Sequence, residues 1–182
     1  MKKTSSLRWL SLTVFAALAL AACSGQSYNT TYRSGSPGLL IKANYTAADA
    51  LLKQLKDRLS PNQPLIAATL VSIDDLERSS TFGRLSSEQI SARFSQAGQR
   101  MIEMKFRDNV YMKRDQGELL LTREIRDVAQ QHKAQAVIVG TYGTSNDAVF
   151  VNLKVIEPNT NVVIAVHDYA LPKDSDIRSM LR

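Results

Sequence analysis

The sequence is poor in the residues that most often carry cross-links and catalysis. Its 182 residues include one cysteine, two histidines and one tryptophan. One cysteine excludes a disulfide framework within the chain, and 44% hydrophobic residues suffice for a core that needs no such cross-link. The excess of positive over negative charge is also small. Without Lys2, Lys3 and Arg8 of the amino-terminal leader, the net charge falls from +6 to +3. So small an excess does not indicate nucleic acid as a partner.

The lone cysteine follows a segment typical of an export signal. Residues 1–8 are basic, and residues 9–20 form an apolar run that is shorter than the ~20 residues of a membrane-spanning helix. The run leads into Leu20-Ala21-Ala22-Cys23, which resembles the lipobox of bacterial lipoproteins. The resemblance implies a signal peptide at 1–22, cleavage between Ala22 and Cys23, S-diacylglycerol on the Cys23 sulfur and an N-acyl chain such as palmitate. The short apolar run argues against the alternative, a free thiol in an uncleaved helix.

Lipid on Cys23 predicts stable membrane attachment, since two or more acyl chains anchor a protein whereas one is marginal. Ser24 follows the cysteine, and in lipoproteins of the enteric type the absence of Asp at this position favours the outer membrane. Residues 23–38 are rich in Ser, Gly, Asn and Thr, which predicts a flexible tether with an average span of roughly 20 Å. We therefore expect a lipid-anchored domain on the periplasmic or outer side of the outer membrane.

Residues 39–172 have the pattern of a single α/β (α+β) domain, and residues 173–182 read as a loose polar tail. Apolar residues at helical spacing predict helices over 46–59, 86–103 and 118–131. Two capping signatures, Thr46 with Asp49 and Ser86 with Gln89, predict where the first two helices begin. Apolar or alternating runs predict strands over 65–73, 109–113, 135–142, 149–156 and 162–169, with turns at 115–117 and 157–161. The order α-β-α-β-α-β-β-β predicts a mixed sheet packed by helices.

Several sequence segments within this domain resemble the FlgO family of outer-membrane lipoproteins associated with flagella. They are a helix before Pro61, a strand ending in Ile73-Asp74-Asp75, the link Gly83-Arg84-Leu85, the run 134–142 and the hairpin turn 157–161. The order of elements is also similar to the amino-terminal domain of TolB, the curli secretion lipoprotein and lipoprotein activators of peptidoglycan synthases.

The resemblance implies a non-enzymatic role in flagellar assembly or motility, with the outer membrane and other envelope proteins, flagellar components among them, as partners. Two alternatives remain open within the same fold group. One is a regulator of peptidoglycan synthesis, and the other is an accessory subunit of an envelope secretion complex.

Neither histidine indicates a catalytic site. His132 is expected at the end of a helix, where a cation suits the helix dipole. His167 adjoins Asp168 on a strand, and because neighbours along a strand point to opposite faces, the two side chains should not share a site. We therefore predict no enzyme, no cofactor and no small-molecule substrate.

Three further groups of residues have simpler explanations than a functional site. Asp74, Asp75 and Glu77 lack the spacing of a calcium loop, so capping of a solvated loop is favoured over a metal site. Gly140 and Gly143 alone do not make the glycine-rich loop that binds phosphate. We interpret them as positions where close packing of the backbone leaves no room for a side chain. Six basic residues, interleaved with acids, read as a solvated face rather than a site for acidic lipid, peptidoglycan or an acidic partner; they are Lys105, Arg107, Lys113, Arg114, Arg123 and Arg126.

Overall fold

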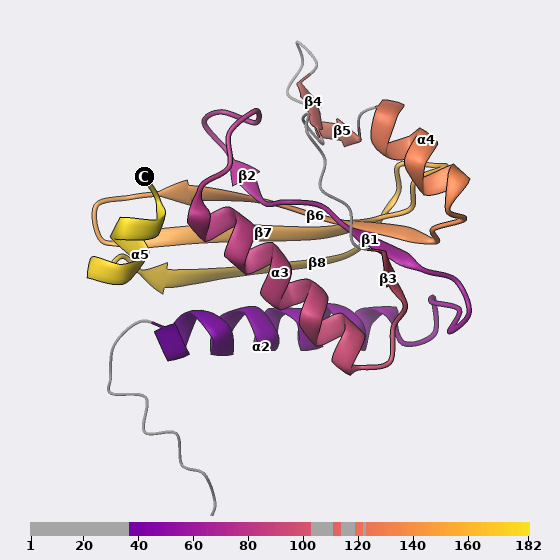
Figure 1. The fold of residues 1–182 in the computed structure, drawn as a ribbon, viewed down its shortest axis with the longest axis horizontal. Coiled ribbons are helices and arrows are strands. Elements are labelled where there is room, and N and C mark those ends of the chain that lie inside the picture. Colours follow the sequence, from indigo (N-terminus) through magenta and orange to yellow (C-terminus); the bar gives the residue numbers. More distant parts are fainter. Residues whose placement is uncertain (1–36, 103–110, 114–118, 122) are drawn as a thin grey trace, which may run out of the picture. The chain divides into compact units, whose positions relative to one another are not determined.

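The computed structural model describes residues 37–102, 111–113, 119–121 and 123–182, and a mixed sheet lies at its centre (Figure 1). β1 (Leu65–Ala67) lies between β3 (Met101–Ile102) and β6 (Ala136–Thr144) and is parallel to both. β2 (Val71–Ser72) also pairs with β6 in parallel, so the predicted strand 65–73 is divided in two.

The second half of the sheet is an antiparallel meander. β7 (Ala148–Ile156) pairs with β6 on one side and with β8 (Val163–Pro172) on the other. The predicted turn at 157–161 joins β7 to β8, where Asn161 adopts a φ of 58°. Parallel and antiparallel pairs thus share β6, which confirms the predicted mixed sheet.

Helices cover the two faces of the sheet unequally (Figure 1). α2 (Pro37–Leu55) and α3 (Thr81–Gln96) pack over the larger core, and α4 (Arg123–Gln131) packs over a smaller core on the other face. The alternation predicted for β7 is confirmed, because its inward residues all belong to the larger core: Val149, Val151, Leu153 and Val155. Full burial of one such side chain contributes roughly 1.5–3 kcal/mol to folding.

α2 begins nine residues before its predicted start, at Pro37. Proline suits the first turn of a helix, where a backbone N–H would have no partner within the helix. Thr46 therefore lies inside the helix and does not cap it. Leu40 is only 1% exposed, so the apolar face of α2 extends well before Thr46, and the helix includes the last residues of the predicted tether.

α3 also begins earlier than predicted. Ser80 is its cap, with a side-chain oxygen that accepts a hydrogen bond from the Gly83 N–H at 3.4 Å. The predicted cap, Ser86, lies within the helix and is buried. α3 ends at Gln96, before the predicted 103, and Gly98 follows with a φ of 86°, a left-handed conformation common just beyond helix ends.

The third predicted helix is shorter than expected. Residues Leu119–Leu121 form β5, antiparallel to β4 (Tyr111–Lys113), and α4 begins only at Arg123. A short leucine run suits either a helix or a strand, so pairing with β4 decides between them. The predicted strand 109–113 is confirmed over 111–113, while residues 109–110 and the turn 115–117 lie outside the described residues.

The tail, predicted to be loose, forms a helix instead. α5 (Ser175–Met180) is capped by Asp174, whose Oδ1 accepts from the N–H groups of Asp176 and Ile177 at 3.1 and 3.0 Å. Ile177 is 2% exposed and joins the larger core. A helix this short, with so few apolar residues, gives no clear periodicity in the sequence.

Candidate functional site

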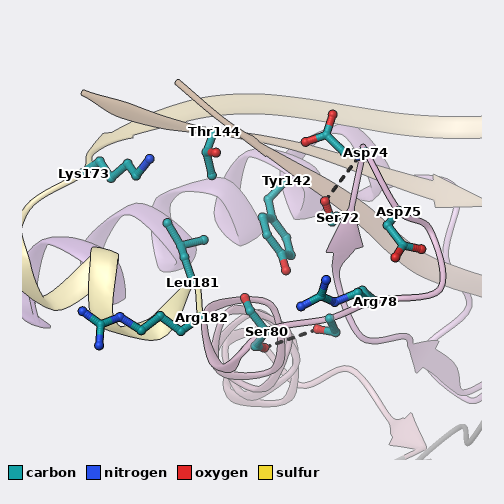
Figure 2. Close-up of a pocket in the computed structure, with 11 residues that line it drawn as sticks. Ser72, Asp74, Asp75, Arg78, Ser80, Tyr142, Thr144, Lys173, Leu181 and Arg182 are labelled. Carbon is teal, nitrogen blue, oxygen red and sulfur yellow. Dashed lines mark hydrogen bonds between the residues drawn. The ribbon is translucent and has the colours of Figure 1, made fainter. Parts of the chain in front are cut away.

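A pocket of about 360 Å³ opens where the parallel strands β2 and β6 end. In open α/β sheets, ligands bind preferentially outside the carboxyl ends of the strands. Three segments that are distant in sequence build its wall: the loop 72–80, the end of β6, and residues before and after α5 (Figure 2). We name it the Tyr142 pocket after the residue at its centre.

Tyr142 projects from β6 into this pocket. The residue is 6% exposed, and its ring meets that of Phe82 edge to face with 5.4 Å between the ring centroids. Figure 2 shows the hydroxyl directed toward the space between Arg78 and Ser80. Among the described residues this hydroxyl has no hydrogen-bond partner, so the end of a mostly buried side chain offers a donor to the pocket.

The amino-terminal end of α3 forms one wall of the pocket. Ser79 and Ser80 line it, and the Ser79 hydroxyl donates to the Leu70 carbonyl oxygen at 2.7 Å, which fixes the loop against β2. A Cβ at Gly83 would lie 2.3 Å from that same oxygen and 2.9 Å from Cε1 of Tyr142. Glycine is therefore what allows the first turn of α3 to approach the strands and the tyrosine so closely.

Charged side chains of both signs surround the opening. Arg78, Lys173 and Arg182 supply positive charge, and Asp74 and Asp75 supply negative charge. Lys173 already has a partner within the protein, because its Nζ donates a hydrogen bond to the Ser145 carbonyl oxygen at 2.9 Å. The Arg78 guanidinium has no hydrogen bond or ion pair within the described residues, so its donors remain free beside the Tyr142 hydroxyl.

The acidic loop singled out in the sequence thus borders the pocket. Asp75 acts as a loop cap, since its Oδ1 accepts from the Glu77 N–H at 3.1 Å. The Asp74 N–H donates to the Ser72 hydroxyl oxygen at 3.3 Å. The loop-capping interpretation is confirmed for Asp75. No pattern in the sequence indicated that Arg78 and Tyr142 would face the same space.

The two histidines lie apart from the pocket. His132 directly follows α4, as predicted, and its N–H donates to the Val128 carbonyl oxygen at 3.1 Å. On β8, His167 is opposite Leu153 and Asp168 is opposite Asn152, so the two side chains project from opposite faces of the sheet. Asp168 instead accepts a hydrogen bond from the Asn152 amide, and the prediction that the pair does not share a site is confirmed.

The two glycines of β6 serve packing. A Cβ at Gly140 would lie 2.8 Å from Cδ2 of Leu153 and 2.9 Å from the Asn152 carbonyl oxygen. At Gly143 the nearest atom would be Cγ2 of Ile73, at 3.0 Å. All three distances are shorter than ordinary contacts, which confirms the interpretation that these glycines relieve close packing.

Other predicted residues cannot be placed. Ala22, Cys23, Lys105, Arg107 and Arg114 lie outside the described residues. For Lys113 and Arg123 the structure gives the backbone only, in β4 and α4. Among the helices of the described ranges, none combines the length and the apolar composition needed to cross a bilayer.

Three solved structures are similar to this chain. The LpoB C-terminal domain from Salmonella enterica gives a TM-score of 0.52 at 11% sequence identity and covers 70% of this chain and 97% of its own. The LpoB C-terminal domain from Escherichia coli gives 0.49 at 12% identity over 70% and 97% of the two chains. The lipoprotein GNA1162 from Neisseria meningitidis gives 0.42 at 12% identity over 62% and 82%. A sequence search among curated proteins gives no significant match.

At such low identity the LpoB likeness concerns the fold alone, and the family is shown by a sequence match. The family model described as FlgO protein matches residues 45–176. This span contains every strand of the sheet, α3 and α4, and most residues of the Tyr142 pocket. The match agrees with the sequence segments that resemble this family. The chain therefore belongs to the FlgO protein family.

Proposed function

We propose that this chain is an outer-membrane lipoprotein that supports flagellar assembly or motility by binding other envelope proteins through its folded domain. The FlgO match over residues 45–176 carries the proposal. The anchor is lipid on Cys23, with S-diacylglycerol on the sulfur and an N-acyl chain, after cleavage behind Ala22. The role requires no cofactor and no small-molecule substrate.

Family and fold support the coarser role, that of a non-enzymatic lipoprotein of the envelope. The positions of the histidines agree with it. Acid–base or nucleophilic catalysis needs a side chain held within hydrogen-bond reach of its partner. Within the described residues, neither His132 nor His167 makes a side-chain hydrogen bond to a carboxylate or a hydroxyl.

The anchor is tested by replacing its sulfur. Cys23→Ala and the control Ser24→Ala are expressed in cells labelled with radioactive palmitate, and membranes are then fractionated. We expect the wild type and Ser24→Ala to be labelled and to reach the outer membrane, and Cys23→Ala to be unlabelled and unprocessed. Processing and fractionation of Cys23→Ala identical to the wild type would disprove the lipid anchor.

The flagellar role is tested by deleting the gene, measuring swimming in soft agar and counting flagella by electron microscopy. Loss of motility that the wild type restores and Cys23→Ala does not would support both the role and the anchor. Normal swimming with normal flagella would overturn the flagellar part and leave the anchor unaffected.

The partner is identified by crosslinking inside the cell. Photoreactive residues at Phe150 on β7 and at Leu85 on α3 sample two elements, because these side chains are 56% and 37% exposed. Capture of flagellar ring components would support the proposal. Capture of a cell-wall synthase, or of a secretion subunit, would instead favour the corresponding alternative within the same fold group.

A further inference from the structure

We propose that the Tyr142 pocket binds a carboxylate, namely the free carboxyl terminus of a peptide or of an acylated amino acid. The inference concerns a ligand that the flagellar proposal does not assign. It does not depend on that proposal, since binding is measured on the purified protein.

The first argument is the unpaired hydroxyl of Tyr142. The residue is 94% buried, because its exposed fraction is 6%, and no described residue accepts its proton. A tyrosine hydroxyl that reaches a cavity can donate one hydrogen bond to a ligand there. The hydroxyl is directed into the pocket, where a bound anion can accept its hydrogen bond (Figure 2).

The second argument is the positive potential at the same place. The Arg78 guanidinium presents free donors in a planar fork that matches the two oxygens of a carboxylate. α3 has 16 residues, and its amino-terminal end, with Ser79 and Ser80, forms the neighbouring wall. Backbone N–H groups of a first helical turn carry partial positive charge and favour an anion. A side-chain cation, a hydroxyl donor and a helix end therefore converge on one cavity.

The charges of the rim favour a carboxylate over a phosphate. Asp74 and Asp75 border the opening, and they repel a dianion more strongly than a monoanion. Lys173 offers little to offset that repulsion, because its Nζ is already bonded to the Ser145 carbonyl oxygen. A singly charged group is thus the better match.

The remaining wall suggests what the carboxylate is attached to. Leu181 lines the pocket and adds an apolar surface beside the polar groups. The volume of about 360 Å³ is at the lower end of ligand pockets, which suits a small terminal residue better than a large aromatic one. A carboxyl-terminal residue with a short apolar side chain satisfies both conditions.

The test uses the full-length protein in detergent micelles, labelled with ¹⁵N and with ¹³C in the tyrosine rings. Three probes are titrated: N-acetylalanine, its uncharged amide N-acetylalaninamide, and inorganic phosphate. Loss of one ring signal in Tyr142→Phe assigns the ring of Tyr142. We expect N-acetylalanine to shift this signal saturably, while the amide does not shift it and phosphate binds more weakly.

Two matched arginine variants decide whether the pocket is responsible. Arg78→Gln removes the free guanidinium, and we expect binding to weaken at least about tenfold, since charged hydrogen bonds are among the stronger polar contacts. Arg84→Gln is the control, because Arg84 is also near the start of α3 but donates to the Thr81 hydroxyl at 3.1 Å and does not line the pocket. It should bind like the wild type.

Tyr142→Phe separates binding from folding. Phenylalanine keeps the ring that contacts Phe82, so the variant should unfold at the same urea concentration as the wild type while its affinity, followed through the Thr144 amide signal, falls several-fold. Equal binding of the acid and its amide, equal loss in Arg78→Gln and Arg84→Gln, unchanged affinity in Tyr142→Phe, or tighter binding of phosphate would each overturn the carboxylate site.

Discussion

The phenol of Tyr169 on β8 donates a hydrogen bond to the side-chain oxygen of Asn44 on α2. Asn44 is fully buried, and its amide nitrogen donates to Oε1 of Gln89 on α3 at 2.7 Å. One asparagine therefore links β8, α2 and α3 through side-chain hydrogen bonds next to the larger apolar core. Fully satisfied polar networks of this kind help to specify a single packing arrangement.

Removing the phenol should destabilise the domain. In Tyr169→Phe the buried oxygen of Asn44 loses its donor, which is expected to lower the free energy of unfolding by about 1–3 kcal/mol. Urea denaturation at neutral pH measures the change. Tyr45→Phe is the matched control. It removes a hydroxyl that accepts an exposed hydrogen bond from Gln96 and keeps the ring beneath the Arg93 guanidinium, so it should lower the free energy of unfolding much less. Equal losses in the two variants would contradict a role for the buried network.

The same tyrosine predicts a dependence on alkaline pH. Burial raises the pKa of Tyr169 above its usual range. The folded state therefore keeps this proton at a pH where the unfolded chain loses it. Its stabilising contribution is complete below the ordinary tyrosine pKa of about 10 and is lost as the pH rises above that value.

We expect the free energy of unfolding to fall with pH above about 10 by up to ~1.4 kcal/mol per pH unit more in the wild type than in Tyr169→Phe. Urea titrations at a series of alkaline pH values measure both slopes. Parallel slopes would show that Tyr169 ionises as easily in the folded as in the unfolded chain.

Substitution by alanine should cost more stability at Gly83 than at Gly98. At Gly83 the added Cβ would lie 2.3 Å from the Leu70 carbonyl oxygen, so the backbone must move, and we expect a loss of roughly 3 kcal/mol. At Gly98 no atom lies within 4 Å, and the only cost comes from its φ of 86°, about 1 kcal/mol. Thermal and urea unfolding of both variants compare the two effects. A larger loss at Gly98 would contradict the close approach of α3 to β2.

The edge of the sheet is protected by α2. The side-chain amide of Gln54 bonds the backbone of Val166 on the edge strand β8. It donates to the Val166 carbonyl oxygen at 2.8 Å and accepts from the Val166 N–H at 3.3 Å, as a further strand would. Arg58 donates to the Ile164 carbonyl oxygen at 3.0 Å. The double variant Gln54→Ala/Arg58→Ala exposes these backbone groups, and free strand edges pair with other chains.

We expect this double variant to self-associate with rising concentration, as measured by analytical ultracentrifugation. Lys53→Ala is the control, since Lys53 is exposed on the same helix as Gln54 and makes no hydrogen bond to β8 within the described residues. Unchanged association in the double variant would show that these side chains do not protect the edge.

The sequence predicted the elements whose pattern is long and regular. β6, β7 and β8 were expected within about three residues of their bounds, because each spans nine or ten residues of apolar or alternating pattern. Helix starts were less accurate. The Ser86 and Gln89 signature predicted a cap that the structure places at Ser80, since a serine caps only where the chain leaves the helical conformation.

The sequence by itself determined the fold class, the family and the prediction of a lipid-bearing Cys23, because periodicity, family sequence motifs and a lipobox are local patterns. Only the tertiary structure decided that Arg78, Tyr142 and the first turn of α3 enclose one pocket, and that Asn44 joins three elements. Tyr142 is separated from Arg78 and α3 by dozens of residues along the chain, and so is Asn44 from Gln89 and Tyr169. Their meeting depends on strand register and helix packing, which no local pattern records.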